Sequence, residues 1–273
     1  MHKIIGAMRR AIKNYKMISD GDKVAVGVSG GKDSLALLTA LAYYRKFSPE
    51  KFDLVAITID LGFDGADEHL QKIREYCDKL DVEFHVEKTD IAKIIFDERK
   101  EKNPCSLCSK MRRGALNTVA TKLGANKVAL GHHVDDVLDT FLLSFIYEGR
   151  LSTFKPVTYL SKMDVTVIRP LIYVQEGDIK GASVRHEFPV YKNPCPADHH
   201  TEREYMKELV DKIKNDPALA EKFKNDPIGT VEGLIGVDLP NDQIQCIVDG
   251  IKAKISLDKL GGLGDKLGGL FGN

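Results

Sequence analysis

The six residues SGGKDS at positions 29–34 combine small residues, hydroxyls and a cation between two apolar runs. The β-branched run 24–28 predicts a buried strand, and leucines at 35, 37, 38 and 41 predict a helix after it. Gly30 and Gly31 would let the backbone approach a bulky anion, and the first turn of a helix presents unpaired N–H groups to it. Lys32 adds a positive charge, and the hydroxyls of Ser29 and Ser34 can donate to phosphate oxygens. The stretch therefore predicts a phosphate-binding turn.

This turn differs from the two best-known phosphate motifs, because it fits neither G-x-x-x-x-G-K-[ST] nor G-x-G-x-x-G. A Gly-Ser turn with a solvent-facing lysine is the structural alternative. The order of small and polar residues directly after a buried strand favours the phosphate-binding interpretation.

A second group of candidate residues is made of cysteines. The segment NPCSLC places Cys105 and Cys108 on what we expect to be one short turn, and Cys195 follows another proline turn in KNPCP. Two thiolates of a C-x-x-C can face one metal centre, and a distant third cysteine can complete a set of three. Cys77 and Cys246 lie in predicted helices, where they are expected to be ordinary buried thiols.

Three cysteines leave several chemistries open. A structural zinc ion normally takes four ligands, so His199 or His200 would have to complete a zinc site. An iron–sulfur cluster held by three cysteines would instead leave one iron open for a ligand that is not protein. A redox-active C-x-x-C is the third alternative.

The segment GHHVDD follows a predicted strand, at the sheet edge where the phosphate turn is expected. Its side chains are His132, His133, Asp135 and Asp136, of which the carboxylates could bind a metal ion beside a triphosphate. Helix capping before Val137 is the alternative role for one aspartate. A basic group, Lys110, Arg112 and Arg113, follows the C-x-x-C and could hold a nucleic-acid backbone or form a solvated face.

These groups must be positioned by an alternating pattern of strands and helices. We expect strands at 24–28, 53–59, 82–87, 126–130 and 165–172, and helices at 3–17, 34–44, 66–80, 111–123 and 137–147. Such alternation predicts an α/β fold with a doubly wound parallel sheet, whose ligand site lies beyond the carboxyl ends of the strands.

The pattern of predicted secondary structure changes near residue 200. We assign residues 1–200 to the α/β domain and residues 201–273 to a small helical appendage, with Thr201 capping one helix, Asp216-Pro217 starting a second and residues 241–255 forming a third. The last stretch nearly repeats DKLGGL and is too rich in glycine for a rigid helix. We expect this appendage to cover the core or link to a partner.

Composition narrows the class of protein. The 273 residues are 43% hydrophobic, enough for a full core, and 40 basic side chains balance 40 acidic ones. This balance argues against a strongly basic nucleic-acid binder but allows a local patch. The sequence shows no apolar stretch of membrane-spanning length and no signal peptide, and its five cysteines do not suggest a disulfide framework, so we expect a cytoplasmic protein.

Several motifs in one order resemble a known family. The chain contains SGGKDS, PCSLCSKMRRGAL, LGANKVALGHHVDDVLDTFLLSFIYEGRL, VIRPLIYVQEGDI and FPVYKNPC. This series is similar to that of the PP-loop, or N-type, ATP pyrophosphatases that thiolate tRNA, above all the 2-thiocytidine synthetase group. The resemblance covers about residues 3–196. It implies an adenine nucleotide alpha-hydrolase-like domain, ATP and Mg²⁺ as cosubstrates and a 4Fe-4S cluster.

The resemblance also implies roles for individual residues. The pyrophosphate end of ATP would be held by Ser29, Gly30, Gly31, Lys32, Asp33 and Ser34, with Gly131, His132 and Asp136 also at the nucleotide. The cluster would be held by Cys105, Cys108 and Cys195. The residues expected to act in catalysis are Lys32, Asp33, Cys105, Cys195, Asp135 and Asp136.

The implied reaction activates the C2 carbonyl oxygen of a pyrimidine, with a cytidine of the anticodon loop as the best candidate. ATP adenylates the oxygen, pyrophosphate leaves, and sulfur displaces AMP, which is a better leaving group. Sulfur would come from sulfide or from the persulfide of a cysteine desulfurase, either presented on an open iron or carried covalently by a cysteine. The partners implied are tRNA and a sulfur donor, without a membrane, and dimers are common in this family.

Two features depart from the family pattern. A second cysteine often follows the third ligand in the family, and here the segment reads NPCPADHH; the N-terminus also lacks the zinc-finger cysteine pairs of enzymes that act on uridine in the TΨC loop. Two other functions compete with thiolation. One is a pyrophosphatase that joins lysine to a tRNA cytidine and needs no cysteines, and the other is a nucleotide- or redox-sensing binding module.

Overall fold

The computed structural model describes residues 1–63, 65–100, 104–148, 152–191, 194–197, 208, 211–213, 215–235 and 251–252. These residues fall into two compact units, one from Met1–His133 with Pro156–Asp198 and one from Val134–Lys155 with His199–Asn273. Each unit is described by itself below. The domain boundary expected at residue 200 stays a prediction.

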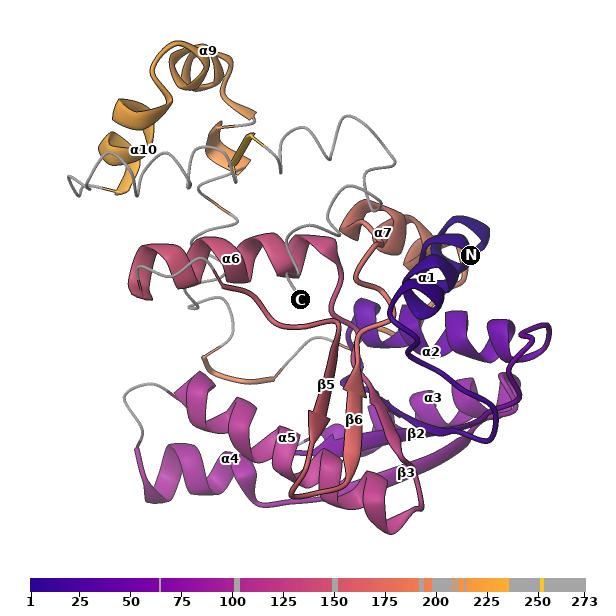
Figure 1. The fold of residues 1–273 in the computed structure, drawn as a ribbon. Coiled ribbons are helices and arrows are strands. Elements are labelled where there is room, and N and C mark those ends of the chain that lie inside the picture. Colours follow the sequence, from indigo (N-terminus) through magenta and orange to yellow (C-terminus); the bar gives the residue numbers. More distant parts are fainter. Residues whose placement is uncertain are drawn as a thin grey trace. The chain divides into compact units, whose positions relative to one another are not determined.

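The first unit is built on a six-stranded sheet (Figure 1). Its strands are β1 (Lys23–Gly27), β2 (Asp53–Asp60), β3 (Glu83–Lys88), β4 (Lys127–Ala129), β5 (Val157–Leu160) and β6 (Val165–Ile168), in the order β3-β2-β1-β4-β6-β5. All neighbouring pairs are parallel except β5 with β6. The strand order reverses between β1 and β4, so the α/β class and the doubly wound parallel sheet are confirmed.

The helices of this unit are α1 (His2–Asn14), α2 (Lys32–Arg45), α3 (Ala66–Lys79), α4 (Ile91–Lys93), the π-helical turn η1 (Ile94–Glu98), α5 (Pro104–Lys122) and α7 (Glu176–Arg185). The sequence predicts α1, α2, α3 and part of α5, but not α4, η1 or α7. It also misses β5, a strand of only four residues, of which three are half-buried and Tyr159 is exposed.

Burial explains the central elements. Val24, Ala25 and Val26 of β1 are fully buried, as in a strand covered on both faces. On one face, α5 contributes Leu116 and Val119 to a cluster with strand residues of β1, β2, β4 and β6. Helix α2 is buried on nearly all sides from Ser34 to Ala42, and it packs against β1 and β2.

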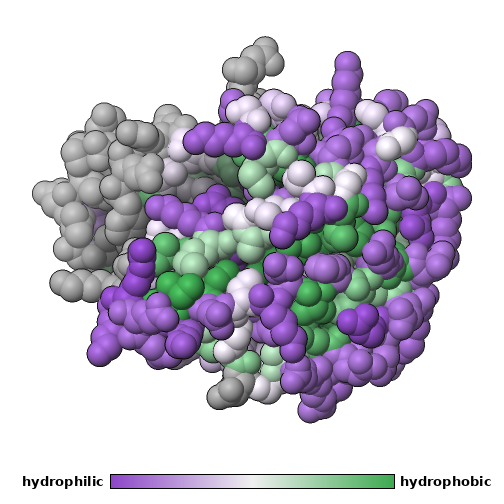
Figure 2. Space-filling model, turned by 90° about the horizontal axis from the view of Figure 1, so that it is seen from below, coloured by the Kyte–Doolittle hydropathy of each residue, from purple (hydrophilic) through white to green (hydrophobic). Residues whose placement is uncertain are grey.

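On the face of the molecule shown in Figure 2, hydrophilic residues surround patches of apolar ones. The exposed large apolar side chains are Tyr43, Phe47, Tyr159, Val184 and Val190. No helix among the described residues is long and apolar enough to cross a membrane.

The second unit contains α6 (Val134–Glu148), α9 (Pro217–Asn225) and α10 (Pro227–Ile235). The predicted start of a helix at Asp216-Pro217 is confirmed, because the Asp216 carboxylate accepts hydrogen bonds from Ala218 N (2.9 Å) and Leu219 N (3.1 Å). Helix α10 is not predicted from the sequence. The cap at Thr201, nearly all of the predicted helix after Asn241, Cys246 and the glycine-rich tail lie outside the described residues.

Candidate active site

The phosphate turn connects the end of β1 to the start of α2, and we call residues 28–31 with the first turn of α2 the PP-loop. Helix α2 begins at Lys32, two residues earlier than predicted, with Gly31 as its N-cap. The sequence prediction was wrong here because apolar periodicity begins only at Leu35, after the polar first turn. As a result Asp33 and Ser34 lie inside that first turn, where the unpaired N–H groups of the helix gather.

Ser34 closes the PP-loop by hydrogen bonds. Its hydroxyl accepts from Ser29 N at 3.2 Å and donates to the Gly31 carbonyl at 2.9 Å, and the Ser29 hydroxyl oxygen lies 3.3 Å away. Gly30 has φ +82°, in the left-handed region that favours glycine. The two serines and the two glycines predicted for phosphate binding therefore form one hydrogen-bonded turn.

Lys32 lies between two carboxylates. Its ammonium is 3.1 Å from Asp33 Oδ2 and 3.0 Å from Glu176 Oε1, in the first turn of α7. Burial alone would lower the pKa of Lys32, but the charges of Asp33 and Glu176 outweigh it, so its pKa stands above the ordinary value. Lys32 is therefore a fixed cation. No sequence motif indicates Glu176 as its partner.

Asp33 turns its other carboxylate oxygen toward His133. The Oδ1 atom is buried, accepts no hydrogen bond among the described residues, and lies 3.5 Å from His133 Nε2. A carboxylate oxygen held this way at the head of a phosphate turn suits a divalent cation.

Gly131 follows β4 and touches the PP-loop. A Cβ on Gly131 would lie 3.0 Å from the backbone carbon and oxygen of Asp33 and 3.1 Å from Ser34 N. A larger residue here would require one of the two backbones to shift by a few tenths of an ångström. His132 comes next and is half-buried, and His133 is buried.

Asp135 and Asp136 lie in the first turn of α6, which begins at Val134. The sequence placed these residues before a helix starting at Val137, which was wrong because the helix begins three residues earlier. Asp135 is buried and Asp136 is half-buried. Because α6 belongs to the second unit, their place at the nucleotide stays a prediction.

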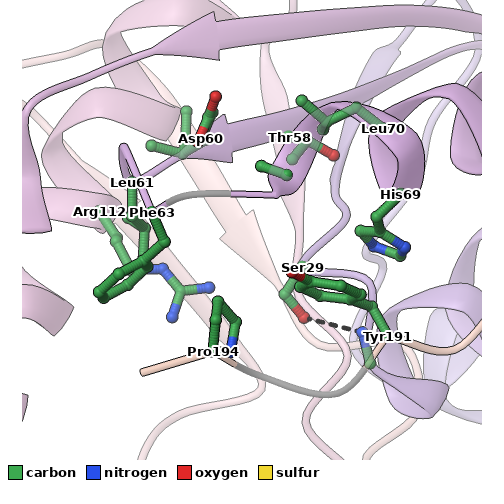
Figure 3. Close-up of a pocket in the computed structure, with 13 residues that line it drawn as sticks. Ser29, Thr58, Asp60, Leu61, Phe63, His69, Leu70, Arg112, Tyr191 and Pro194 are labelled. Carbon is green, nitrogen blue, oxygen red and sulfur yellow. Dashed lines mark hydrogen bonds between the residues drawn. The ribbon is translucent and has the colours of Figure 1, made fainter. Parts of the chain in front are cut away.

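A pocket of about 290 Å³ opens beside the PP-loop (Figure 3). Its walls come from the ends of β1 and β2, the start of α3, α5 and the segment after α7. The lining residues are Ser29, Gly31, Thr58, Ile59, Asp60, Leu61, Phe63, Ala66, His69, Leu70, Arg112, Tyr191 and Pro194. A largely apolar cavity next to a phosphate turn has the size and chemistry for a nucleoside.

The last residues of β2 line one wall of this pocket. The Thr58 hydroxyl donates to the Val28 carbonyl at 2.8 Å, which ties β2 to the first residue of the PP-loop. At the next turn Asp60 Oδ1 accepts from Gly62 N at 3.0 Å. The sequence predicts the β2 strand but gives no signal that its last residues line a pocket.

Cys105 and Cys108 lie among the first five residues of α5, which begins at Pro104. The prediction of a separate short turn followed by a helix from Met111 was wrong, because proline at a first helical position starts the helix directly. Three residues apart on a helix, the two cysteines share one side. Neither forms a disulfide, and neither do Cys195 and the fully buried Cys77.

The pKa of Cys108 depends on its burial, on Arg112 and on the two other candidate cysteines. Burial raises its pKa; Arg112 lowers it by its charge and by a hydrogen bond, while the neighbouring Cys195 and Cys105 raise it. Among the described residues no three His, Cys, Asp or Glu side chains converge on one ion site. Cysteines of a cubane cluster bind different irons and need not converge on one ion. His199 and His200, the alternative zinc ligands, lie outside the described residues.

Arg112 joins the pocket to the thiols. It lines the pocket, where its guanidinium lies between Phe63 and Pro194 (Figure 3), and it also contacts Cys108. The sequence offered two roles for Arg112, contact with a nucleic-acid backbone or a place on a solvated face; Arg112 lines the pocket, and a contact with nucleic acid stays a prediction. Its neighbour Arg113 lies near Arg169, whose pKa is lowered to about 10 by burial and by the charge of Arg113.

Comparison with known proteins decides the family. The model of the PP-loop domain matches residues 3–213. The chain belongs to the PP-loop family. Among curated PP-loop relatives, the tRNA-cytidine(32) 2-sulfurtransferase of Geobacter sulfurreducens is 38% identical over 87% of this chain and 93% of its own length. The enzyme of the same name from Stutzerimonas stutzeri is 41% identical over 73% of each chain.

A solved PP-loop structure is also similar. The U34-tRNA thiolase NcsA from Methanococcus maripaludis, solved with its [4Fe-4S] cluster, has a TM-score of 0.63 and 25% identity, covering 93% of this chain and 79% of NcsA. The family resemblance and the enzyme class predicted from the sequence, a tRNA thiolation enzyme, are confirmed.

Proposed function

We propose that this PP-loop enzyme uses ATP to replace the C2 oxygen of a tRNA cytidine with sulfur, and that Cys105, Cys108 and Cys195 hold a 4Fe-4S cluster. One observation carries the proposal. A single pocket has the PP-loop on one side and, on the other, Arg112 and Pro194, which are neighbours of Cys108 and Cys195. A nucleotide in this pocket would lie close to the thiols.

The geometry of the site supports a specific way of binding ATP. The N–H groups at the start of α2, the Ser29 and Ser34 hydroxyls and Lys32 would bind the pyrophosphate end. The apolar walls formed by Ile59, Leu61 and Phe63 would enclose the nucleoside. Asp33 Oδ1, buried without a hydrogen bond among the described residues, would bind Mg²⁺.

The thiolation would proceed in two steps, adenylation of the base and substitution by sulfur. The C2 oxygen of cytidine attacks the α-phosphorus of ATP, and pyrophosphate leaves toward Lys32 and the PP-loop. Hydrosulfide then attacks C2, the C–O bond breaks to release AMP, and the S–H proton is lost to solvent to leave the C2 thiocarbonyl. Arg112, facing the pocket, would stabilise the negative charge that develops on the adenylate.

The three cysteines suit the cluster in chemistry and place. None of the three forms a disulfide, and Cys105 and Cys108 lie at the start of α5. Burial raises the pKa of the Cys108 thiol, and the charge of Arg112 opposes that rise. When bound, a cluster held by three cysteines would supply one open iron that holds and orients hydrosulfide. The sulfur donor and the oligomeric state stay predictions.

Metal analysis of protein purified without oxygen tests the cluster assignment. We expect about four irons and four acid-labile sulfides per chain, lost in Cys195→Ser. Cys77→Ala is the matched control, because Cys77 is fully buried in α3 and should leave the iron content unchanged. One zinc ion per chain, or an unchanged iron content in Cys195→Ser, would contradict the assignment.

A further inference from the structure

The segment after α7 crosses the PP-loop before it reaches Cys195. It starts at Phe188, which is buried, with its ring edge-on to Tyr76 of α3 at a centroid distance of 6.0 Å. It passes Tyr191 and Pro194, which both line the nucleotide pocket, and Cys195 follows directly. One short stretch therefore contacts α3, the nucleotide pocket and the cysteine group.

Tyr191 makes two contacts that bear on the PP-loop. Its backbone N–H donates to the Gly30 carbonyl at 3.0 Å. Its ring stacks on the imidazole of His69 with a centroid distance of 4.2 Å and an interplanar angle of 16° (Figure 3). The PP-loop backbone is thus held by the same residue whose ring rests on α3.

His69 packs against the ring of Tyr191 from helix α3. It is only 8% exposed, and its Nε2 atom is buried with no hydrogen bond among the described residues. A Cβ added to Gly30 would collide with that Nε2 atom. Burial and the nearby charge of Lys72 lower the pKa of His69, so its ring is neutral at pH 7. A flat, neutral ring therefore packs against both Gly30 and Tyr191.

We propose that Tyr191 and His69 are positioning residues that hold the PP-loop in register with Cys195. This inference rests on the proposed function and adds to it two residues outside the phosphate turn and the cysteines. Its consequence is that the α-phosphate and the sulfur site are set relative to each other by one stack and one backbone hydrogen bond. Small displacements of reacting groups lower the rate of a reaction by large factors.

The test compares Tyr191→Ala, Tyr191→Phe and His69→Ala with wild type. Three quantities are measured: the Kd for ATP, the iron content, and the ratio of pyrophosphate released to 2-thiocytidine formed. We expect Tyr191→Ala and His69→Ala to keep their iron while the Kd rises about tenfold, within the usual range of coupling between sites. The ratio should also rise, because nucleotide is consumed without sulfur transfer.

Tyr191→Phe should restore both the Kd and the ratio, since phenylalanine keeps the stack and the backbone N–H. Tyr159→Ala, at an exposed tyrosine of β5, should leave both unchanged. If Tyr191→Ala does not fold, Tyr191→Leu takes its place, because leucine fills the volume without stacking.

Two results would overturn the inference. One is a Kd and a ratio that stay at wild-type values in both Tyr191→Ala and His69→Ala. The other is a Tyr191→Phe protein as impaired as Tyr191→Ala, which would assign the effect to the hydroxyl. A wild-type protein that forms no 2-thiocytidine would contradict the proposed function alone, since the Kd still reports on the PP-loop.

Discussion

The ammonium of Lys32 lies 3.0 Å from the carboxylate of Glu176, so the cation of the PP-loop is held by α7 as well as by its neighbour Asp33. The side chain of Glu176 is only 18% exposed, so this ion pair is partly buried and salt weakens it less than it would a fully exposed pair. An incoming triphosphate has to approach Lys32 in the presence of two negative charges. We therefore expect Glu176 to weaken the attraction of the PP-loop for phosphate.

Replacing that charge should change nucleotide affinity. In Glu176→Gln the amide keeps the shape and can still accept a hydrogen bond from Lys32, but repulsion of the phosphates is removed. We expect the Kd for ATP, measured by calorimetry, to fall about threefold, a change of roughly 0.7 kcal/mol, as for other partly exposed charge pairs. Asp178→Asn is the control, since Asp178 is on the same helix but pairs with Lys3. A weaker affinity in Glu176→Gln would show that the charge positions Lys32 rather than competing with phosphate.

Gly131 should tolerate no side chain. In Gly131→Ala the new Cβ would press on the backbone of Asp33 and Ser34, which cannot move aside as a flexible side chain can. We expect a loss of about 1–3 kcal/mol in the free energy of unfolding, with a higher Kd for ATP. Urea unfolding and calorimetry measure the two effects.

Gly6→Ala serves as the matched control for Gly131→Ala. Gly6 lies in the middle of α1 with open space around its Cβ position. Alanine should stabilise this helix by about 0.5–1 kcal/mol. Equal effects of the two substitutions would mean that the contact between Gly131 and the PP-loop is not restrictive.

The buried imidazole of His69 predicts a pH dependence of stability. Because burial and Lys72 lower its pKa in the folded state, the unfolded chain binds the proton more readily. The contribution is constant above the ordinary histidine pKa of about 6.5, and the free energy of unfolding falls as pH drops below that value. Urea unfolding at pH 7.5 and 5.5 should show a smaller acid loss in His69→Gln than in wild type. Equal losses in the two proteins would contradict this origin.

The sequence predicts those parts of the fold whose signal is local. Strand β1 and helix α2 are apolar runs, and Asp216 precedes Pro217 as a helix cap should. Strand β5 escapes prediction because it is short, half-buried and antiparallel at the edge of the sheet. The boundaries at α5 and α6 shift because their first turns are polar or begin with proline.

The residues of the candidate site also differ in whether the sequence alone predicts them. Ser29, Gly30 and Lys32 are recognised because neighbours in sequence form one turn. Glu176, His69 and Tyr191 reach the PP-loop from α7, α3 and a late segment, and only the folded chain brings them there. Their types alone, one carboxylate and two rings, carry no signal above that of ordinary surface or core residues.

The most direct test of the account is nucleoside analysis of tRNA by mass spectrometry. Cluster-loaded protein is incubated without oxygen with unmodified tRNA, ATP, Mg²⁺ and sulfide, alongside Lys32→Met and Cys195→Ser. The account predicts 2-thiocytidine with wild type, none without ATP, and none above background with either variant. A wild-type protein that consumes ATP with tRNA but forms no 2-thiocytidine, or a Cys195→Ser protein that still forms it, would contradict the account.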